Sequence, residues 1–159
     1  MEILKTDWKR LLLCLAIPLG VGGLAALLTG GSMADYSEMN QPPLAPPGWL
    51  FPVVWTLLYL MMGYASYRII NSGGEPQQVR KALSLYGAQL AVNFLWPLGV
   101  FGLQMYLLAF FVLLLLWLLV ALTIGAFARL DDTAADLMLP YILWVTYAAY
   151  LNVGAYLLN

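Results

Sequence analysis

The chain has 159 residues, of which 63% are hydrophobic and only 9% charged, and its mean hydropathy is +0.83. A soluble domain carries about 25% charged residues, so this chain has too few polar groups to cover a water-facing surface and is predicted to lie in a lipid bilayer as one domain, residues 1–159. The net charge of −1 excludes a nucleic-acid partner. The sequence contains no histidine and a single cysteine, Cys14, which argues against a metal centre. A single cysteine also excludes an intrachain disulfide.

Five hydrophobic stretches follow one another along the chain. A bilayer core about 30 Å thick requires about 20 apolar residues per helix. Residues 82–128 form one uncharged run of 47 residues, enough for about two crossings, and the proline and glycines of 97–104 favour a turn there. We therefore predict an all-α fold, an integral membrane bundle of five transmembrane helices, with spans at about 11–29, 49–70, 82–98, 105–128 and 137–158.

The lysines and arginines test this number of spans. Five spans place all seven cations on one side of the membrane: Lys5, Lys9, Arg10, Arg68, Arg80, Lys81 and Arg129. The positive-inside rule then predicts a cytoplasmic N-terminus and an external C-terminus. A signal peptide is the competing interpretation of the basic start, but the apolar stretch of about 19 residues exceeds the usual length of about 7–15.

Conventional acid–base or metal chemistry is not predicted inside the membrane, because the spans contain no acidic or basic side chain apart from Arg68 at one end. The spans instead carry amides and aromatic rings at helical spacing. Since amides cost too much free energy to face lipid, these stripes should face the interior. They comprise Trp55 and Tyr59 in the second span, Gln89, Asn93 and Trp96 in the third, and Trp144, Ala148 and Asn152 in the fifth.

Two interpretations of these stripes remain open. The amides could serve only as hydrogen-bonding groups that hold the helices together, and tryptophans near span ends could belong to the interfacial belt. Alternatively, Trp55, Trp96 and Trp144 converge on a flat aromatic cavity suited to a planar hydrophobic molecule. Segment 30–48 contains two proline pairs and could be a lid over such a cavity or a simple linker.

Three motifs in chain order resemble the signature of the translocator protein and tryptophan-rich sensory protein (TspO/MBR) family. The sequence PPGWLFP at 46–52 with WTLLY at 55–59 resembles PPxWxF…WTxLY. Gln89-Leu90, Asn93 and Trp96 resemble QLxxNxxW. Pro140-Tyr141, Trp144 and Leu151-Asn152 resemble PYxxW…LN. The motifs extend from the first loop to the last helix, so the chain is identified as a bacterial-type member of this family.

The resemblance implies a five-helix bundle, commonly a homodimer, in a cell membrane, here the bacterial cytoplasmic membrane. Its pocket would open toward the first loop among helices one, two, three and five, with no obligatory cofactor and no metal. The implied ligands are porphyrins, such as protoporphyrin IX or haem, and drugs of the benzodiazepine class. Carried over by motif, the ligand-binding residues would be Tyr36, Trp49, Trp55, Tyr59, Asn93, Trp96, Trp144 and Ala148.

Two alternative functions stay open beside ligand binding. In bacterial relatives, light- and oxygen-dependent porphyrin degradation has been attributed to tryptophans at the positions of Trp55 and Trp144, which would then be the catalytic residues. A purely structural role in the membrane is the third possibility.

The chain also departs from the family pattern at several positions. Leu44 and Ala45 stand where a tryptophan is common, and the outer loops lack lysine and arginine, so porphyrin propionates would meet water, amides or backbone N–H groups. The chain also lacks the C-terminal cation of the cholesterol consensus, so that mode of sterol recognition is not predicted.

Overall fold

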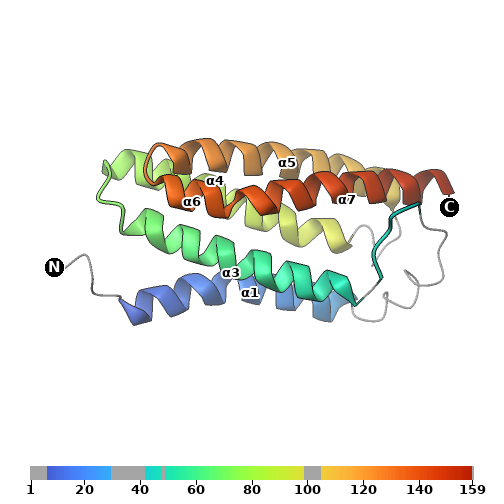
Figure 1. Cartoon of the computed structure of the whole chain (residues 1–159), viewed down its shortest axis with the longest axis horizontal. Helices are drawn as coiled ribbons and strands as arrows, with labels where there is room; N and C mark the ends of the chain where they lie inside the picture. Colours follow the sequence, from blue (N-terminus) through green and yellow to red (C-terminus); the bar gives the residue numbers. More distant parts are fainter. Residues whose placement is uncertain (1–6, 30–41, 48, 99–104, 159) are drawn as a thin grey trace.

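Long helices lying side by side make up the computed structural model, which describes residues 7–29, 42–47, 49–98 and 105–158 (Figure 1). The helices are α1 (Trp8–Thr29), α3 (Leu50–Ile70), α4 (Pro76–Pro97), α5 (Tyr106–Ala128), α6 (Asp132–Leu137) and α7 (Leu139–Leu158). No strand occurs within the described residues. The predicted all-α membrane bundle is therefore confirmed, with the short α6 added before the last span.

Four segments of the described chain are long and apolar enough to cross a membrane: Trp8–Leu28, Leu50–Ile70, Tyr106–Ala128 and Asp132–Leu158. The fifth long helix, α4, has 22 residues, but its first turns are polar and its interior carries Gln89 and Asn93. Both amides are buried against the other helices. The hydropathy of α4 is thus lowered partly by its polar, exposed first turns and partly by amides that face the bundle interior rather than lipid.

Helix α4 begins before the predicted third span. The span is expected to begin near residue 82, where the apolar run begins, and α4 begins at Pro76. Proline is favoured in the first turn of a helix, because its missing N–H would have no intrahelical partner there. The helix therefore extends beyond its apolar stretch by the polar turns that contain Arg80 and Lys81.

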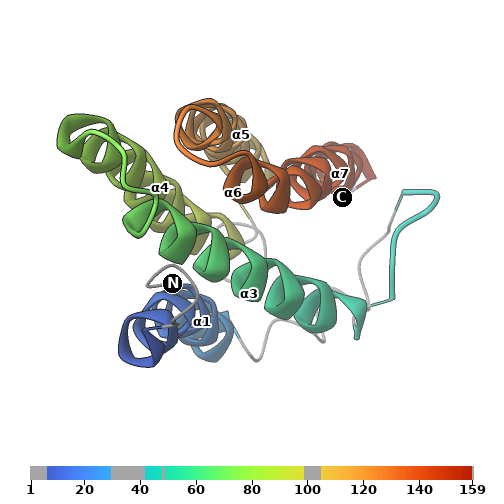
Figure 2. The same cartoon turned by 60° about the vertical axis from the view of Figure 1, so that its left-hand side comes forward.

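Lipid-facing and interior faces alternate with helical periodicity along α5. Leu113, Leu116 and Val120 are buried, whereas Leu114, Leu115 and Leu118 are exposed. α5 packs along both α4 and α7, while α1 packs along α3, so the bundle forms two groups of helices, which are joined mainly where α3 meets α6 and where α1 meets α4 (Figure 2). Exposed leucines on a membrane helix identify the surface that meets acyl chains.

All described cations lie at the end of the bundle where the N-terminus lies. Figure 1 shows the start of α1, the α3–α4 connection and the α5–α6 turn at this end, and the C-terminus at the other. Arg68 at the end of α3 reaches Asp131, with Nε–Oδ2 at 3.0 Å and Nη2–Oδ1 at 3.3 Å. Asp131 Oδ1 also accepts hydrogen bonds from Thr133 N and Ala134 N, which caps α6.

Replacing Asp131 by alanine should lower the free energy of unfolding by about 1 kcal/mol, mainly through loss of the α6 cap. The ion pair adds little, because the Arg68 side chain is 34% exposed. In a chain of this size the change corresponds to a decrease of about 2–4 °C in the melting midpoint, measured by circular dichroism in detergent. Asp136→Ala, an exposed position at the other end of α6, is the matched control. Equal shifts in both variants would contradict the capping role.

Candidate functional site: an aromatic cluster beside an α3–α7 crevice

Trp55 of α3 lies at the centre of an aromatic cluster. Its ring stacks on Tyr59 with centroids 5.6 Å apart, and it meets Trp96 of α4 at 6.4 Å. From α7, Tyr141 and Trp144 present their rings edge-on to Trp55 at 6.1 and 6.4 Å. The three indoles expected to face inward therefore do converge. They pack against one another, however, so the centre of the cluster is occupied by the rings themselves.

A chain of buried hydrogen bonds joins α3, α4 and α7 directly beneath this cluster. Tyr59 Oη donates to Asn93 Oδ1 at 2.7 Å, and Asn93 Nδ2 donates to Tyr141 Oη at 2.8 Å. Tyr141 Oη in turn donates to Gln89 Oε1 at 2.6 Å. Each amide and hydroxyl thus has a partner in another helix. These amides therefore hold the helices together by hydrogen bonds, which is the role that one interpretation of the sequence gave them.

A second polar contact fixes Trp96. Its Nε1 donates to Asn152 Oδ1 at 3.1 Å, and Asn152 Nδ2 donates to the backbone oxygen of Tyr106 at 2.7 Å. Asn152 is 2% exposed, so both hydrogen bonds are shielded from lipid and water. The Trp96 ring is therefore held in one orientation by α7 and α5.

An apolar crevice of about 400 Å³ lies beside the cluster, between α3 and α7. Val54, Leu57, Leu58 and Met61 line it from α3, and Pro140, Leu143, Trp144 and Tyr147 line it from α7. The crevice exists because α3 packs against α6 but runs apart from α7, as Figures 1 and 2 show. Its walls come from α3 and α7, whereas the resemblance implied a pocket shared by four helices.

The Trp144 side chain, which lines the crevice, carries an unpaired polar group. Its Nε1 atom is buried and has no hydrogen-bond partner among the described residues. An unpaired buried donor costs about 1–3 kcal/mol, so an acceptor that reached it would gain that free energy back. Phe51 and Tyr147 hold the indole by edge-on contacts at 6.0 and 5.4 Å. The Trp144 N–H is thus an oriented, unpaired donor next to the apolar crevice, and a ligand in the crevice would contact it only after neighbouring side chains moved.

The described part of the proline-rich segment, residues 42–47, is attached to α7. Tyr147 Oη donates to the backbone oxygen of Leu44, and Tyr150 Oη donates to that of Pro43. Gly154 permits the contact, because a Cβ there would lie 2.5 Å from Pro42 Cγ. Figure 1 shows this segment running from the end of α7 toward the start of α3. These contacts favour a strap over a free linker, while residues 30–41 and 48 lie outside the described residues.

The structure brings together six of the eight residues that the motifs nominated for ligand binding. Trp55, Tyr59, Asn93, Trp96 and Trp144 belong to the cluster or its hydrogen bonds, and Ala148, 1% exposed, lies one turn beyond Trp144 in the core. Trp49 lies apart, immediately before α3, and is 68% exposed, as an interfacial tryptophan would be. Tyr36 lies outside the described residues.

Tyr141 was not nominated as a site residue, although it connects Asn93 with Gln89 and contacts Trp55. It is 1% exposed. Its position three residues before Trp144 predicts that it lies on the same face of α7, and this spacing could have identified it as a site residue. Gln89 carried the same signal, four residues before Asn93.

Helix α1 contributes to the site through a glycine. A Cβ at Gly22 would lie 2.1 Å from Tyr59 Cε2, so the Tyr59 ring rests directly on the α1 backbone. Gly20 and Gly23 have no atom within 4 Å of such a Cβ. Of the three glycines in this stretch, Gly22 is therefore the one that serves packing within the bundle.

Comparison with known proteins identifies the family of the chain. Residues 14–157 match the model of the TspO/MBR family. The chain is 37% identical over 150 residues to the tryptophan-rich protein TspO of Chlorobaculum tepidum, covering 94% of this chain and 95% of that protein. It is 38% identical over 156 residues to the tryptophan-rich sensory protein of Cereibacter sphaeroides, covering 98% and 95%. It is 39% identical over 126 residues to the translocator protein of Ovis aries, covering 79% and 75%. With its all-helical membrane bundle and three inward tryptophans, the chain belongs to the TspO/MBR family.

Proposed function

We propose that this chain binds porphyrins and similar flat hydrophobic molecules in the membrane and acts in their sensing, sequestration or transport. Membership of the TspO/MBR family supports a membrane sensory or binding role. The observation that carries the finer proposal is the α3–α7 crevice, which the Trp144 ring lines, with the buried, unpaired Trp144 N–H next to it and the rings of Trp55, Trp96 and Tyr59 behind it. A planar apolar ligand with a few acceptor atoms matches this surface.

The position of the crevice favours a ligand that arrives from the lipid phase. Leu57 and Leu143 at its rim are 56% and 70% exposed, so they meet acyl chains rather than water. A hydrophobic ligand dissolved in the bilayer could reach Trp144 without crossing the polar end of the bundle. Occupation of the space behind Trp144 would further require the Trp55 ring to turn aside, because this ring fills the centre of the cluster.

The ligand's acidic groups would lie outside the described cluster, because the residues lining the crevice include no cation. Propionates of a porphyrin would therefore remain near the membrane surface, while the macrocycle occupied the crevice. Neutral and monoanionic flat ligands should for this reason bind at least as tightly as dicarboxylic porphyrins.

Titration with protoporphyrin IX in detergent or nanodiscs tests the proposal. The ligand should quench tryptophan fluorescence, and Trp144→Phe should weaken binding by about two- to tenfold, since one hydrogen bond contributes about 0.5–1.5 kcal/mol. Trp8→Phe, at an exposed tryptophan near the N-terminus, is the control and should leave the affinity unchanged. Undiminished quenching and affinity in a Trp55→Phe, Trp144→Phe double variant would argue against this site.

The edge-on contact between Trp55 and Trp144 is also the observation that favours the second candidate function, light- and oxygen-dependent porphyrin degradation. In such a reaction the porphyrin is oxidised and dioxygen is the oxidant. Illumination of the complex should then consume many porphyrins per protein molecule. A single stoichiometric event that leaves an oxidised tryptophan in the protein would count against catalysis.

We propose, from the charge distribution, that the cation-bearing end faces the cytoplasm, with the C-terminus outside a bacterial cytoplasmic membrane. The described cations lie at one end of the bundle, as this orientation requires (Figure 1). The homodimer implied by the resemblance remains a prediction, to be tested by the mass of the protein in detergent.

A further inference from the structure

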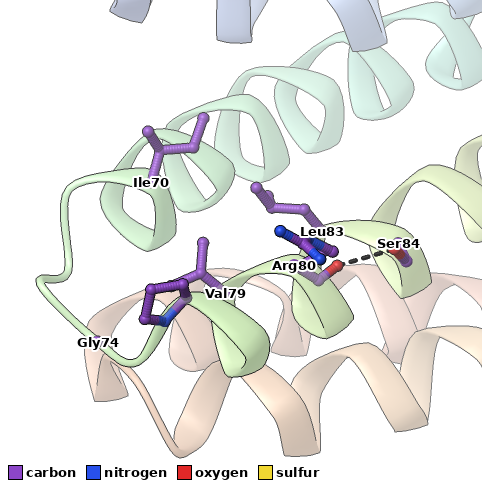
Figure 3. A pocket seen from close by; sticks show the side chains of 7 residues that line it. Ile70, Gly74, Val79, Arg80, Leu83 and Ser84 are labelled. Atoms are coloured by element: carbon purple, nitrogen blue, oxygen red, sulfur yellow. Dashed lines mark hydrogen bonds between the residues drawn. The ribbon is translucent and has the colours of Figure 1, made fainter.

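A groove of about 620 Å³ lies at the cation-bearing end of the bundle, away from the aromatic cluster. It runs between the end of α3 and the start of α4 (Figure 3). Ile70 forms one side, and Val79, Arg80 and Leu83 form the other. The groove therefore combines an apolar wall with a single cationic side chain.

The shape of the groove is fixed by the α3–α4 connection. Gly73 has a φ of 74°, a left-handed conformation that glycine adopts without strain. A Cβ at Gly74 would lie 2.3 Å from Leu130 Cδ2, so the connection is packed closely against the end of α5. A connection held in this way keeps the end of α3 and the start of α4 at a constant separation.

Arg80 differs from Arg68 and Arg10 in its lack of a partner. Arg68 is paired with Asp131, and Arg10 contacts Asp7 and donates to Asn71 Oδ1 at 2.7 Å. The guanidinium of Arg80 forms no ion pair or side-chain hydrogen bond within the described residues; only its backbone oxygen is engaged, by Ser84 Oγ at 2.8 Å.

The residues that line the groove include no acidic side chain. Glu75, which precedes α4, is exposed and makes no side-chain capping hydrogen bond. Lys81, next to Arg80, adds a second exposed cation. The charge at this position is therefore positive, and it lies where a chain of this kind meets lipid headgroups.

We infer that this groove holds one anionic phospholipid, with its phosphate on the Arg80 guanidinium and an acyl chain along Ile70, Val79 and Leu83. An arginine fork binds phosphate oxygens in a bidentate manner, and basic pockets between membrane helices bind anionic headgroups. An aqueous anion would leave the apolar wall uncovered, whereas a phospholipid covers both parts. This lipid site is independent of the proposed porphyrin function.

Native mass spectrometry of the full chain released from nanodiscs tests the site. With equal phosphatidylglycerol and phosphatidylcholine, the wild-type protein should retain one phosphatidylglycerol in preference to phosphatidylcholine. Arg80→Gln should reduce this preference by about fivefold, because the bidentate contact between the guanidinium and the phosphate is lost. Arg129→Gln removes an exposed cation at the same end but outside the groove, and should change the preference by less than about twofold.

Two further measurements separate the lipid from other occupants. Leu83→Trp should fill the apolar wall and reduce retention while Arg80 stays in place. Soluble glycerol phosphate should not compete, because it has no acyl chain. Equal retention of both lipids, equal losses in Arg80→Gln and Arg129→Gln, undiminished retention in Leu83→Trp, or full competition by glycerol phosphate would each overturn the inference.

Discussion

Replacing Tyr141 by phenylalanine should lower the free energy of unfolding by about 2 kcal/mol. The substitution keeps the ring against Trp55 but removes the hydroxyl that accepts from Asn93 and donates to Gln89. Interhelical hydrogen bonds in membranes average about 0.6 kcal/mol and reach about 1.7. Tyr141→Phe removes two such hydrogen bonds and leaves the almost fully buried amides of Asn93 and Gln89 short of a partner, so the expected loss of free energy lies toward the upper end of this range. The melting midpoint in detergent should fall by about 4–8 °C.

Tyr156→Phe is the matched control on the same helix. Tyr156 is 48% exposed, so its hydroxyl is accessible from outside the bundle and the substitution should leave the midpoint nearly unchanged. A double-mutant cycle identifies the origin of the loss: in a Gln89→Leu background, Tyr141→Phe should cost less, because Gln89 is no longer left unpaired. Additive effects of the two substitutions would show that the two side chains are not coupled.

The interior faces of α3, α4 and α7 could be predicted from the sequence alone. Gln89, Asn93 and Trp96 are 0%, 2% and 4% exposed, as their spacing on one helical face predicts. Because an amide that faces lipid loses its hydrogen bonds, the helix face that carries the amides must point into the bundle. The position of the described cations at one end of the bundle could also be predicted, because charged side chains avoid the membrane interior.

The detailed arrangement of the site could not be predicted in this way. Periodicity shows that Trp55 faces inward but not that its ring occupies the space between Trp96 and Trp144. That outcome depends on side-chain rotamers and on the distance between α3 and α7, which are tertiary properties. The crevice arises from the divergence of these two helices, and one-dimensional patterns contain no information on helix separation.

The hydrogen-bond partner of each amide could not be predicted from the sequence either. Asn93 was nominated as a ligand-binding residue, yet both ends of its amide are engaged by Tyr59 and Tyr141. A ligand that bound Asn93 would have to replace one of these hydrogen bonds. Ligand binding at Asn93 therefore stays a prediction that competes with a structural role, and the Tyr141→Phe variant, which frees Asn93 Nδ2, offers a way to separate the two.

Gly63→Ala should destabilise the protein by about 2 kcal/mol, although alanine is the better helix former. A Cβ at Gly63 would lie 2.7 Å from the backbone oxygen of Cys14 and 2.9 Å from Leu15 Cα. Because both atoms belong to the α1 backbone, no rotamer change can relieve the contact, and α1 must move away. Overpacking of this kind costs about 1–3 kcal/mol, which at its upper end outweighs the gain of about 1 kcal/mol in helix propensity.

Gly87→Ala provides a control of opposite sign, because a Cβ at Gly87 in α4 meets no atom within 4 Å and only the gain in helix propensity remains. Its melting midpoint should stay constant or rise, whereas that of Gly63→Ala falls. Cys14, the only cysteine and 6% exposed, reports on the same contact locally. Displacement of α1 should speed the labelling of Cys14 by a membrane-permeant maleimide, well below the melting midpoint, in Gly63→Ala but not in Gly87→Ala. Identical labelling rates in the two variants would mean that α1 and α3 tolerate a methyl group between them, and that the close approach at Gly63 does not hold α1 against the site.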